Sequence, residues 1–412
     1  MAEPRTYPCG WDQNERLTSA SRGVKTRDKV AKAWRFKDDS LLPDLVAAWW
    51  SIIARHLSLR VAFREFEPGF FEQSVLPLDA VEPWLVVLDD PSAGQLATLR
   101  SHVGLHTGQL FLIALVNRPV GMEMYFIADH ICVDSRSLHV IYAELAEYLG
   151  SGEARPRETD DLFLRECLAD PPSPRAVRPA ETSGFAPYAE PPLSFRTGRG
   201  KYALEATRIR LPWTAFSFDA RAVAPGLGPA LLVNGLDALH GEVPGRPGDY
   251  PVVGTLNNRK TYAYERAVGP FASWFMLSVP AGSADNLLVR SRRVYGRLLN
   301  AMRRPPPPFA LETAIRVPEL FEARNWPYHQ APRYLYANHL QPTPQLVLGG
   351  EVGDPIPLET DLRGYSAARV LSRAHDDGLD LLFTARTDLL APGVTERLAR
   401  YAQETVQEVV QS

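Results

Sequence analysis

Apolar positions recur along this chain with two different periods, which separate predicted strands from predicted helices. Residues 30–36 alternate apolar and basic side chains, as in a strand with one wet face. Residues 41–56 instead repeat their apolar positions at helical spacing (Leu42, Leu45, Val46, Trp49, Ile52 and Ile53). Shorter apolar runs typical of strands follow at 72–76, 84–88 and 110–116. The first part of the chain therefore predicts a mixed α/β structure.

The stretch from Gly121 to Gly150 carries the clearest change of period. Residues 122–128 are apolar and aromatic enough for a buried strand. The apolar residues that follow recur at helical spacing: Leu138, Ile141, Tyr142, Leu145 and Tyr148. Between strand and helix lies His130-Ile-Cys-Val-Asp134, with Ser135 or Ser137 expected to cap the helix. A histidine and an aspartate thus stand where a core strand ends.

General base catalysis is the chemistry that this pair of residues offers. Histidine has the unperturbed pKa closest to working pH, so His130 could take a proton from an attacking hydroxyl, amine or thiol. Asp134 could fix the loop or the imidazole. The alternative is a satisfied core histidine beside a helix-capping aspartate. Cys132 between them could be a nucleophile, although a free cysteine at an apolar strand end is usually a small packed residue.

The second half of the chain begins after a change in composition. Prolines crowd residues 151–199, and we therefore predict an N-terminal lobe at 1–170, a Pro-rich linker at 171–200 and a C-terminal lobe at 201–412. The predicted strands of the C-terminal lobe are 202–211, 251–256, 274–279, 369–371 and 379–386, and its predicted helices are 229–240, 284–302 and 392–410.

Several segments in order resemble one superfamily. The segment at 130–134 is similar to the HHxxxDG motif of condensation-domain and chloramphenicol-acetyltransferase-like acyltransferases, with Asp129 and Ser135 replacing the first histidine and the glycine. Residues 55–63, which include His56 and Arg60, are similar to that family's RHxxLRxxF segment. Residues 253–273 are similar to its GxxxxxR…xGxF stretch. The chain thus resembles the members of this superfamily, of the free-standing condensation-enzyme or polyketide-associated type.

The resemblance implies a fold, a reaction and a set of site residues. It implies an α/β fold of two chloramphenicol-acetyltransferase-like lobes, each a mixed sheet covered by helices, with a channel between them. An acyl group would pass from a thioester, on coenzyme A or carrier-protein phosphopantetheine, to a small-molecule hydroxyl or amine acceptor, with no bound cofactor. His130 would be the base, Asp134 would pair with Arg259, and Ser273 would donate near the oxyanion. The alternative is a non-acylating member, acting as a binding or docking module or in cyclisation or elimination.

An arginine row lies on the predicted helix at 284–302. Arg290, Arg293 and Arg297 fall near one helical face, which is either a solvated face or a dock for coenzyme A phosphates or an acyl carrier protein.

Composition limits the remaining classes of function. The net charge of −3, from 45 basic and 48 acidic residues, argues against a nucleic-acid partner. Three widely spaced cysteines predict neither disulfides nor a metal site, and they fit a reduced cytoplasm. No signal peptide is evident, and we expect no membrane span, because no run of about 18 apolar residues stands out.

Overall fold

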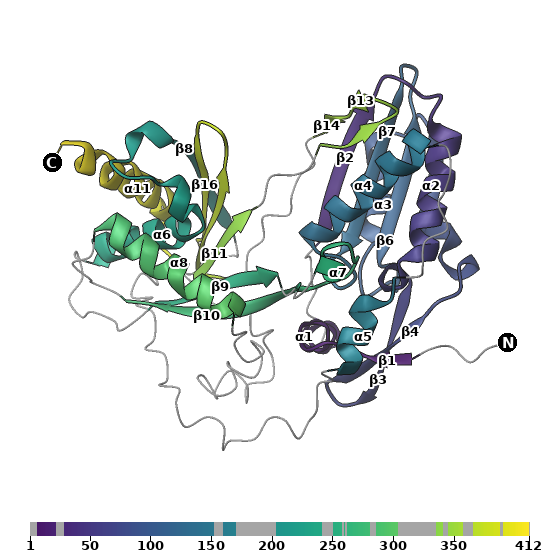
Figure 1. Cartoon of the computed structure of the whole chain (residues 1–412), viewed down its shortest axis with the longest axis horizontal. Helices are drawn as coiled ribbons and strands as arrows, with labels where there is room; N and C mark the ends of the chain where they lie inside the picture. Colours follow the sequence, from purple (N-terminus) through teal and green to yellow (C-terminus); the bar gives the residue numbers. More distant parts are fainter. Residues whose placement is uncertain are drawn as a thin grey trace. The chain divides into compact units, whose positions relative to one another are not determined.

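Two compact units make up the structure, a computed structural model that describes residues 6–21, 29–151, 160–169, 203–240, 250–257, 259, 262–280, 286–303, 335–340, 345–356, 366–387 and 390–411. The first unit holds Met1–Val177, Arg259–Ala272 and Thr343–Asp361, and the second holds Arg178–Asn258, Ser273–Pro342 and Leu362–Ser412 (Figure 1). The predicted division into 1–170 and 201–412 is therefore corrected, because two later segments fold with the first unit. The predicted linker at 171–200 lies outside the described residues.

A five-stranded mixed sheet forms the centre of the first unit. Its strand order is β14 (Asp354–Pro355), β2 (Lys29–Phe36), β7 (Met122–Asp129), β6 (Phe111–Asn117) and β5 (Leu85–Asp89). β7 pairs antiparallel with both β2 and β6, whereas β5 is parallel to β6. Every residue of β7 is buried. The strand that precedes His130 is thus central to the sheet, as its apolar run predicted.

Helices cover both faces of this sheet. On one face, α2 (Leu42–Arg55) packs beside α4 (Ser135–Ser151), and Trp49 of α2 stacks on Phe126 of β7 with ring centroids 5.5 Å apart. On the other face, α3 (Ala93–His102) lies over the alternate side chains of the strands, such as Tyr125. Since successive strand residues point to opposite faces, neighbouring residues of β7 such as Tyr125 and Phe126 contact different layers.

A smaller antiparallel sheet and several short elements complete the first unit. The small sheet has the order β1 (Thr6–Pro8), β4 (Phe70–Val75) and β3 (Val61–Glu67). The remaining elements are α1 (Trp11–Ser21), η1 (Leu57–Leu59), η2 (Asp79–Trp84), α5 (Leu162–Ala169), α7 (Tyr262–Glu265), β12 (Val347–Leu348) and β13 (Glu351–Val352). The sequence pattern did not predict α1, because polar residues are frequent in it.

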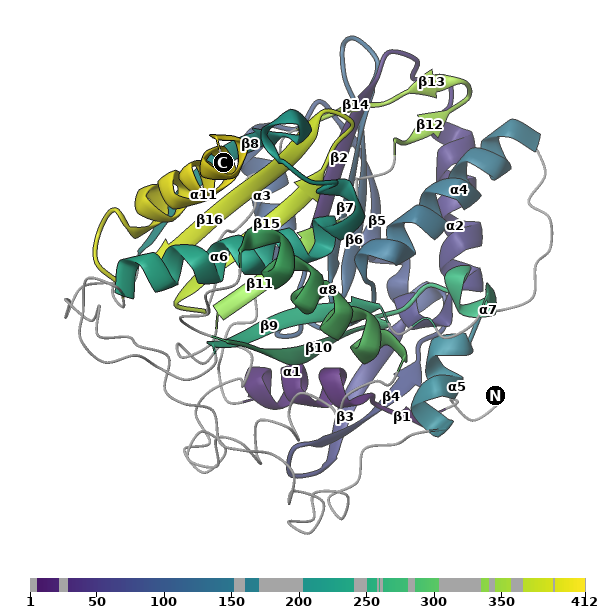
Figure 2. The same cartoon turned by 60° about the vertical axis from the view of Figure 1, so that its left-hand side comes forward.

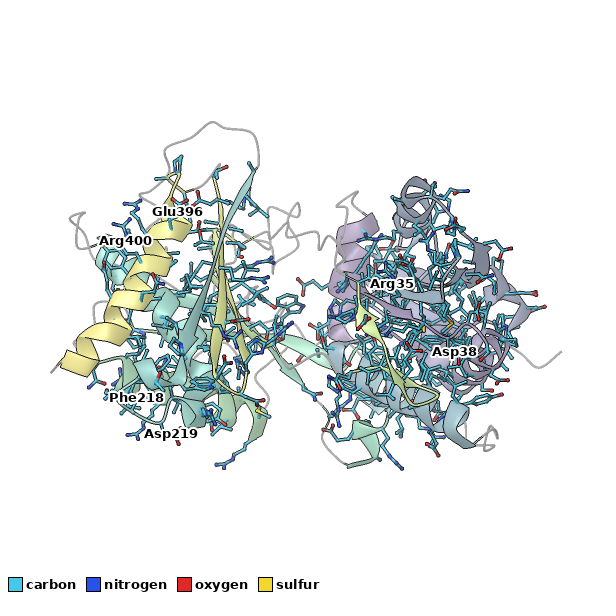
Figure 3. The ribbon with its side chains drawn as sticks, turned by 90° about the horizontal axis from the view of Figure 1, so that it is seen from above. Arg35, Asp38, Phe218, Asp219, Glu396 and Arg400 are labelled. Carbon is cyan, nitrogen blue, oxygen red and sulfur yellow. The ribbon has the colours of Figure 1, made fainter. Side chains whose placement is uncertain are left out.

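The second unit is a six-stranded sheet with its helices on one face (Figure 2). The strand order is β10 (Ala272–Val279), β9 (Tyr250–Asn257), β11 (Leu335–Leu340), β15 (Ala368–Ala374), β16 (Gly378–Arg386) and β8 (Leu204–Pro212). β11 runs parallel to β9 and β15, while β15, β16 and β8 are antiparallel. The helices are α6 (Ala224–His240), α8 (Leu287–Arg303) and α11 (Val394–Gln411), with short turns η4 (Trp213–Ala215) and η5 (Arg221–Val223). Glu396 and Arg400 mark α11 in Figure 3. The predicted fold, two mixed sheets covered by helices, is confirmed.

One described helical stretch passes a simple test for a membrane span. Arg221–Leu239 is long and apolar enough by length and composition alone. However, 72% of its apolar window is buried inside the structure. Its apolar side chains, such as Leu231 and Leu232, belong to the core of the second unit.

Candidate active site

His130 lies in the turn that follows β7, and its side chain is half-buried. Its Nδ1 is 3.0 Å from the backbone oxygen of Val133. A carbonyl oxygen can only accept a hydrogen bond, so this contact assigns the proton of the neutral imidazole to Nδ1. Nε2 then carries the lone pair. The turn therefore holds the ring as the tautomer whose Nε2 is the basic nitrogen.

Asp134 begins α4 as its capping residue. Its Oδ1 accepts hydrogen bonds from the backbone N–H and the hydroxyl of Ser137, both at 2.8 Å. The expectation that Ser135 or Ser137 would cap the helix is therefore wrong, because the carboxylate takes the orphan N–H group. Ser137 instead uses its hydroxyl to bridge Asp134 and the backbone of Gly269, at 2.9 Å from the Gly269 oxygen and 3.0 Å from its nitrogen.

Asp134 also forms the ion pair that the resemblance implied. The guanidinium of Arg259 donates to both oxygens of the carboxylate, with Nη2 3.0 Å from Oδ1 and Nη1 bonded to Oδ2. The two side chains are only 0% and 3% exposed. Arg259 also donates to the backbone oxygens of Tyr264 and Ala267, at 3.0 and 3.1 Å, and lies 4.4 Å from the ring centre of Phe271. Asp134 thus faces Arg259, and both oxygens of its carboxylate are bonded within the first unit.

His56, from the second resembling segment, is held between two carboxylates. Its Nδ1 is 2.7 Å from Asp160 and its Nε2 is 2.8 Å from Glu144, in a fully buried position. Burial lowers the pKa of His56, but the hydrogen bonds to Asp160 and Glu144 raise it by more, so the pKa lies above its ordinary value. Burial raises the pKa of Asp160, but its partners, His56 first, lower it by more. The sequence did not reveal this network, since its members are far apart in the chain.

Arg60 closes the C-terminal end of α2. Its guanidinium donates to the backbone oxygens of Leu76, Ile53 and Ala54, at 2.6, 3.2 and 3.2 Å. The arginine of the resembling segment therefore donates to backbone oxygens at the end of α2 and just after β4, and it is a cation at the C-terminal end of a helix.

Cys132 is not placed to act as a nucleophile. Its side chain is fully buried, and its Sγ donates to the backbone oxygen of Asp129 at 3.2 Å. Burial, followed by the charge of Asp129, raises the thiol pKa well above its ordinary value, so the reactive thiolate is disfavoured. Among the residues that the structure describes, no group of three or more His, Cys, Asp or Glu side chains could hold a metal ion.

The remaining candidate residues belong to the second unit. Ser273 lies half-buried near the start of β10. Arg290 is 3% exposed, and its guanidinium bonds to Asn234 and, at 2.9 Å, to Asp237 of α6. The prediction that Arg290 binds the donor is therefore corrected, because this guanidinium is used inside the unit. Arg293 is exposed and Arg297 is half-buried, so only these two of the row remain candidates.

Sequence comparison reaches only distant relatives. No protein-family model matches the chain. Malformin synthetase mlfA of Aspergillus sclerotiicarbonarius is 27% identical over 148 residues, which are 34% of this chain and 3% of that protein. Malformin synthetase mlfA of Aspergillus brasiliensis is 26% identical over 129 residues, or 29% of this chain and 2% of that protein. The chain thus spans a very small part of the curated relatives it matches.

Solved structures resemble the chain along almost its whole length. The X-domain from teicoplanin biosynthesis has a TM-score of 0.71 at 18% identity, covering 100% of this chain and 96% of its own. The starter condensation domain of the rhizomide synthetase RzmA has a TM-score of 0.67 at 17% identity, covering 98% and 96%. The epimerization domain of tyrocidine synthetase B has a TM-score of 0.65 at 14% identity, covering 99% and 98%. The chain therefore has the condensation-domain-like fold of nonribosomal peptide synthetases.

Proposed function

We propose that this chain is an acyltransferase of the condensation type. An acyl group would move from a thioester, on coenzyme A or on carrier-protein phosphopantetheine, to a hydroxyl or amine acceptor in natural-product or lipid biosynthesis. The observation that carries the proposal is the Nδ1 contact of His130 with Val133, which leaves Nε2 as the basic nitrogen of a half-buried ring.

In this mechanism Nε2 of His130 takes the proton of the acceptor as its oxygen or nitrogen bonds to the thioester carbonyl carbon. The tetrahedral intermediate then collapses, the carbon–sulfur bond breaks, and the imidazolium returns the proton to the leaving thiolate. Ser273 is proposed as a donor to the oxyanion on the basis of the resemblance alone. Asp134 does not exchange protons in this scheme, because Arg259 and Ser137 hold its carboxylate.

The partners follow from the same reaction. We propose a small-molecule acceptor and, as the donor, either acyl-coenzyme A or an acyl carrier protein. Arg293 and Arg297 are the proposed donor-binding residues that remain. We further propose that the chain works in the cytoplasm, which its three free cysteines favour.

A thiol-release assay tests the proposal directly. Purified protein is mixed with a panel of acyl-coenzyme A and acyl-carrier thioesters, with and without hydroxyl and amine acceptors. We expect thiol release that requires an acceptor, and a loss of about 100-fold or more in His130→Ala. The matched control is His102→Ala, which changes an exposed histidine of the same unit and should keep full activity. Equal turnover in His130→Ala and the wild type would remove the mechanism.

A second candidate is a non-acylating protein that binds a partner or promotes cyclisation or elimination. Asp129 favours it, because the first histidine of the motif is replaced by a carboxylate whose side chain is 0% exposed. The X-domain from teicoplanin biosynthesis, which shares the fold, has been solved in complex with OxyB. This candidate is preferred if no pair of donor and acceptor gives thiol release with the wild-type protein.

A further inference from the structure

One of the two residues that depart from the motif, Asp129, forms a buried ion pair directly beside His130. Its Oδ1 accepts a hydrogen bond from Nη2 of Arg16 at 3.0 Å, and the two side chains are 0% and 9% exposed. The same oxygen accepts the backbone N–H of Ile131 at 3.0 Å. Asp129 thus links an arginine of α1 to the backbone on both sides of His130.

A second residue of α1 reaches the same turn. The amide nitrogen of Gln13 donates to the backbone oxygen of Ile131 at 3.2 Å. Gln13 is itself fixed, since its Oε1 accepts from the backbone nitrogen of Gly10 at 2.9 Å and from Nε2 of Gln73 at 3.1 Å. Helix α1 therefore contacts the residues before and after His130 through two buried, hydrogen-bonded side chains.

The turn is consequently held at both ends. Its C-terminal end is fixed by Asp134, through Arg259 and the first turn of α4. Its N-terminal end is fixed by Arg16 and Gln13. Removing one charge of a buried pair leaves the other uncompensated. A neutral histidine at position 129 would not supply the carboxylate that pairs with Arg16 here, so the substitution and this ion pair belong together.

We propose that Arg16 and Asp129 are positioning residues, which hold the turn so that His130 keeps Nδ1 on Val133 and presents Nε2 to the reactants. The inference rests on the proposed function of His130 as the base. It assigns a task to α1 and accounts for the carboxylate that replaces the first histidine of the motif.

Kinetics of Asp129→Asn, Arg16→Gln and the double variant test the proposal. A displacement of about 1 Å can cost about 100-fold in rate, so we expect each single variant to lose about 10- to 100-fold in kcat with little change in KM. The double variant should recover part of that loss, because both members of the pair are then neutral. Additive losses, or single variants with normal kcat, would overturn the proposal.

The matched control is Glu123→Gln at the other end of β7. Glu123 is 4% exposed and pairs with Arg118 and with Arg35, which is labelled in Figure 3. This variant neutralises a buried carboxylate of the same strand, whose arginine partners are 58% and 23% exposed, without touching the turn. It should lower the melting temperature as the test variants do, while kcat stays within about 2-fold of the wild type if positioning is the cause. An equal loss of kcat in this control would reduce the role of Arg16 and Asp129 to general stability.

Nitrogen-15 NMR of labelled histidine provides a readout that does not need turnover. His130→Ala assigns the resonances, and the wild type should show one tautomer, with the proton on Nδ1. Asp129→Asn and Arg16→Gln should mix the two tautomers, while Glu123→Gln should not. If the wild type transfers no acyl group, the proposed function fails, but an altered tautomer still supports the positioning role. Unchanged resonances in the folded variants would refute it.

A neutral variant covers the case in which the charge variants do not fold. Gln13→Met removes the contact with Ile131 without leaving a charge buried. We expect the same mixture of tautomers and a smaller loss of kcat, about 10-fold. Wild-type resonances in this variant, together with wild-type kcat, would refute the positioning role of α1.

Discussion

The buried ion pair between Asp134 and Arg259 should determine whether the first unit is stable. Arg259 is 125 residues downstream of Asp134, yet it belongs to the same unit. Asp134→Asn removes the charge but keeps an oxygen that can accept the N–H of Ser137, so it preserves the helix cap. The variant therefore isolates the loss of the counter-charge on Arg259.

The size of the effect follows from burial. Breaking a buried pair by removing one partner costs about 3–5 kcal/mol, because the other charge remains without compensation. Both side chains are almost fully buried, so screening by solvent does not reduce this cost much. For a unit of this size, 1 kcal/mol corresponds to about 2–4 °C, so the melting temperature should fall by roughly 6–20 °C. Arg259→Gln should give a loss of similar size.

Thermal unfolding of both single variants and of the double variant measures the pair. We expect the double variant to be less destabilised than the sum of the singles, with a coupling of about 1–3 kcal/mol. The control is Arg64→Gln, which removes a guanidinium whose side chain is 76% exposed from its pair with Glu72, at an expected cost below about 1 kcal/mol. Strictly additive losses, or an Asp134→Asn that is no less stable than this control, would refute the reasoning.

Three further predictions concern other positions. At pH values below 6.5, its ordinary pKa, His56 stabilises the fold, and this stabilisation is lost as the pH rises through the higher pKa of the folded state. In His56→Gln, the free energy of unfolding from urea titrations should therefore fall less steeply above about pH 6.5 than in the wild type. Arg290→Gln should cost about 3–5 kcal/mol, whereas Arg293→Gln, at an exposed position, should cost less than about 0.5 kcal/mol in thermal unfolding. Gly121→Ala should cost more than about 1 kcal/mol of stability, because φ is 74° there and the new Cβ would lie 2.1 Å from a backbone oxygen of β2. Equal melting temperatures of this variant and the wild type would contradict the prediction.

The strands and helices of this fold were largely encoded in local patterns. Residues 122–128 lack alternation because β7 is central and buried on both faces, and this run predicted its position. The apolar face of α2 was equally clear, and its buried residues are those at helical spacing. By contrast, α1 escaped prediction because several of its buried side chains are polar, including Gln13 and Arg16. Their partners lie in β4, at the end of β7 and in the turn after it, which no local pattern reveals.

Long-range connections were the other limit. The sequence placed residues 259–272 in the second lobe, because a predicted strand precedes them and another follows. Arg259, Val268 and Gly269 instead bond to Asp134, Asp160 and Ser137 of the first unit. Only the resemblance, which paired an arginine at 259 with the motif aspartate, pointed to this connection. The period of apolar residues shows which face of a helix or strand is buried, but it does not show which unit that face packs against.

The spacing of four between His130 and Asp134 now has a physical explanation. A strand that ends at Asp129 reverses through a turn, in which the backbone nitrogen of Cys132 bonds to the oxygen of Asp129 at 3.2 Å. The backbone oxygen of Val133 then accepts a hydrogen bond from the imidazole of His130. Asp134, the next residue, caps α4 with its carboxylate. A shorter connection would leave no carbonyl to fix the tautomer, and a longer one would separate the cap from the turn. The histidine is thus left outside both regular elements with one nitrogen occupied, and the aspartate is used entirely by the scaffold.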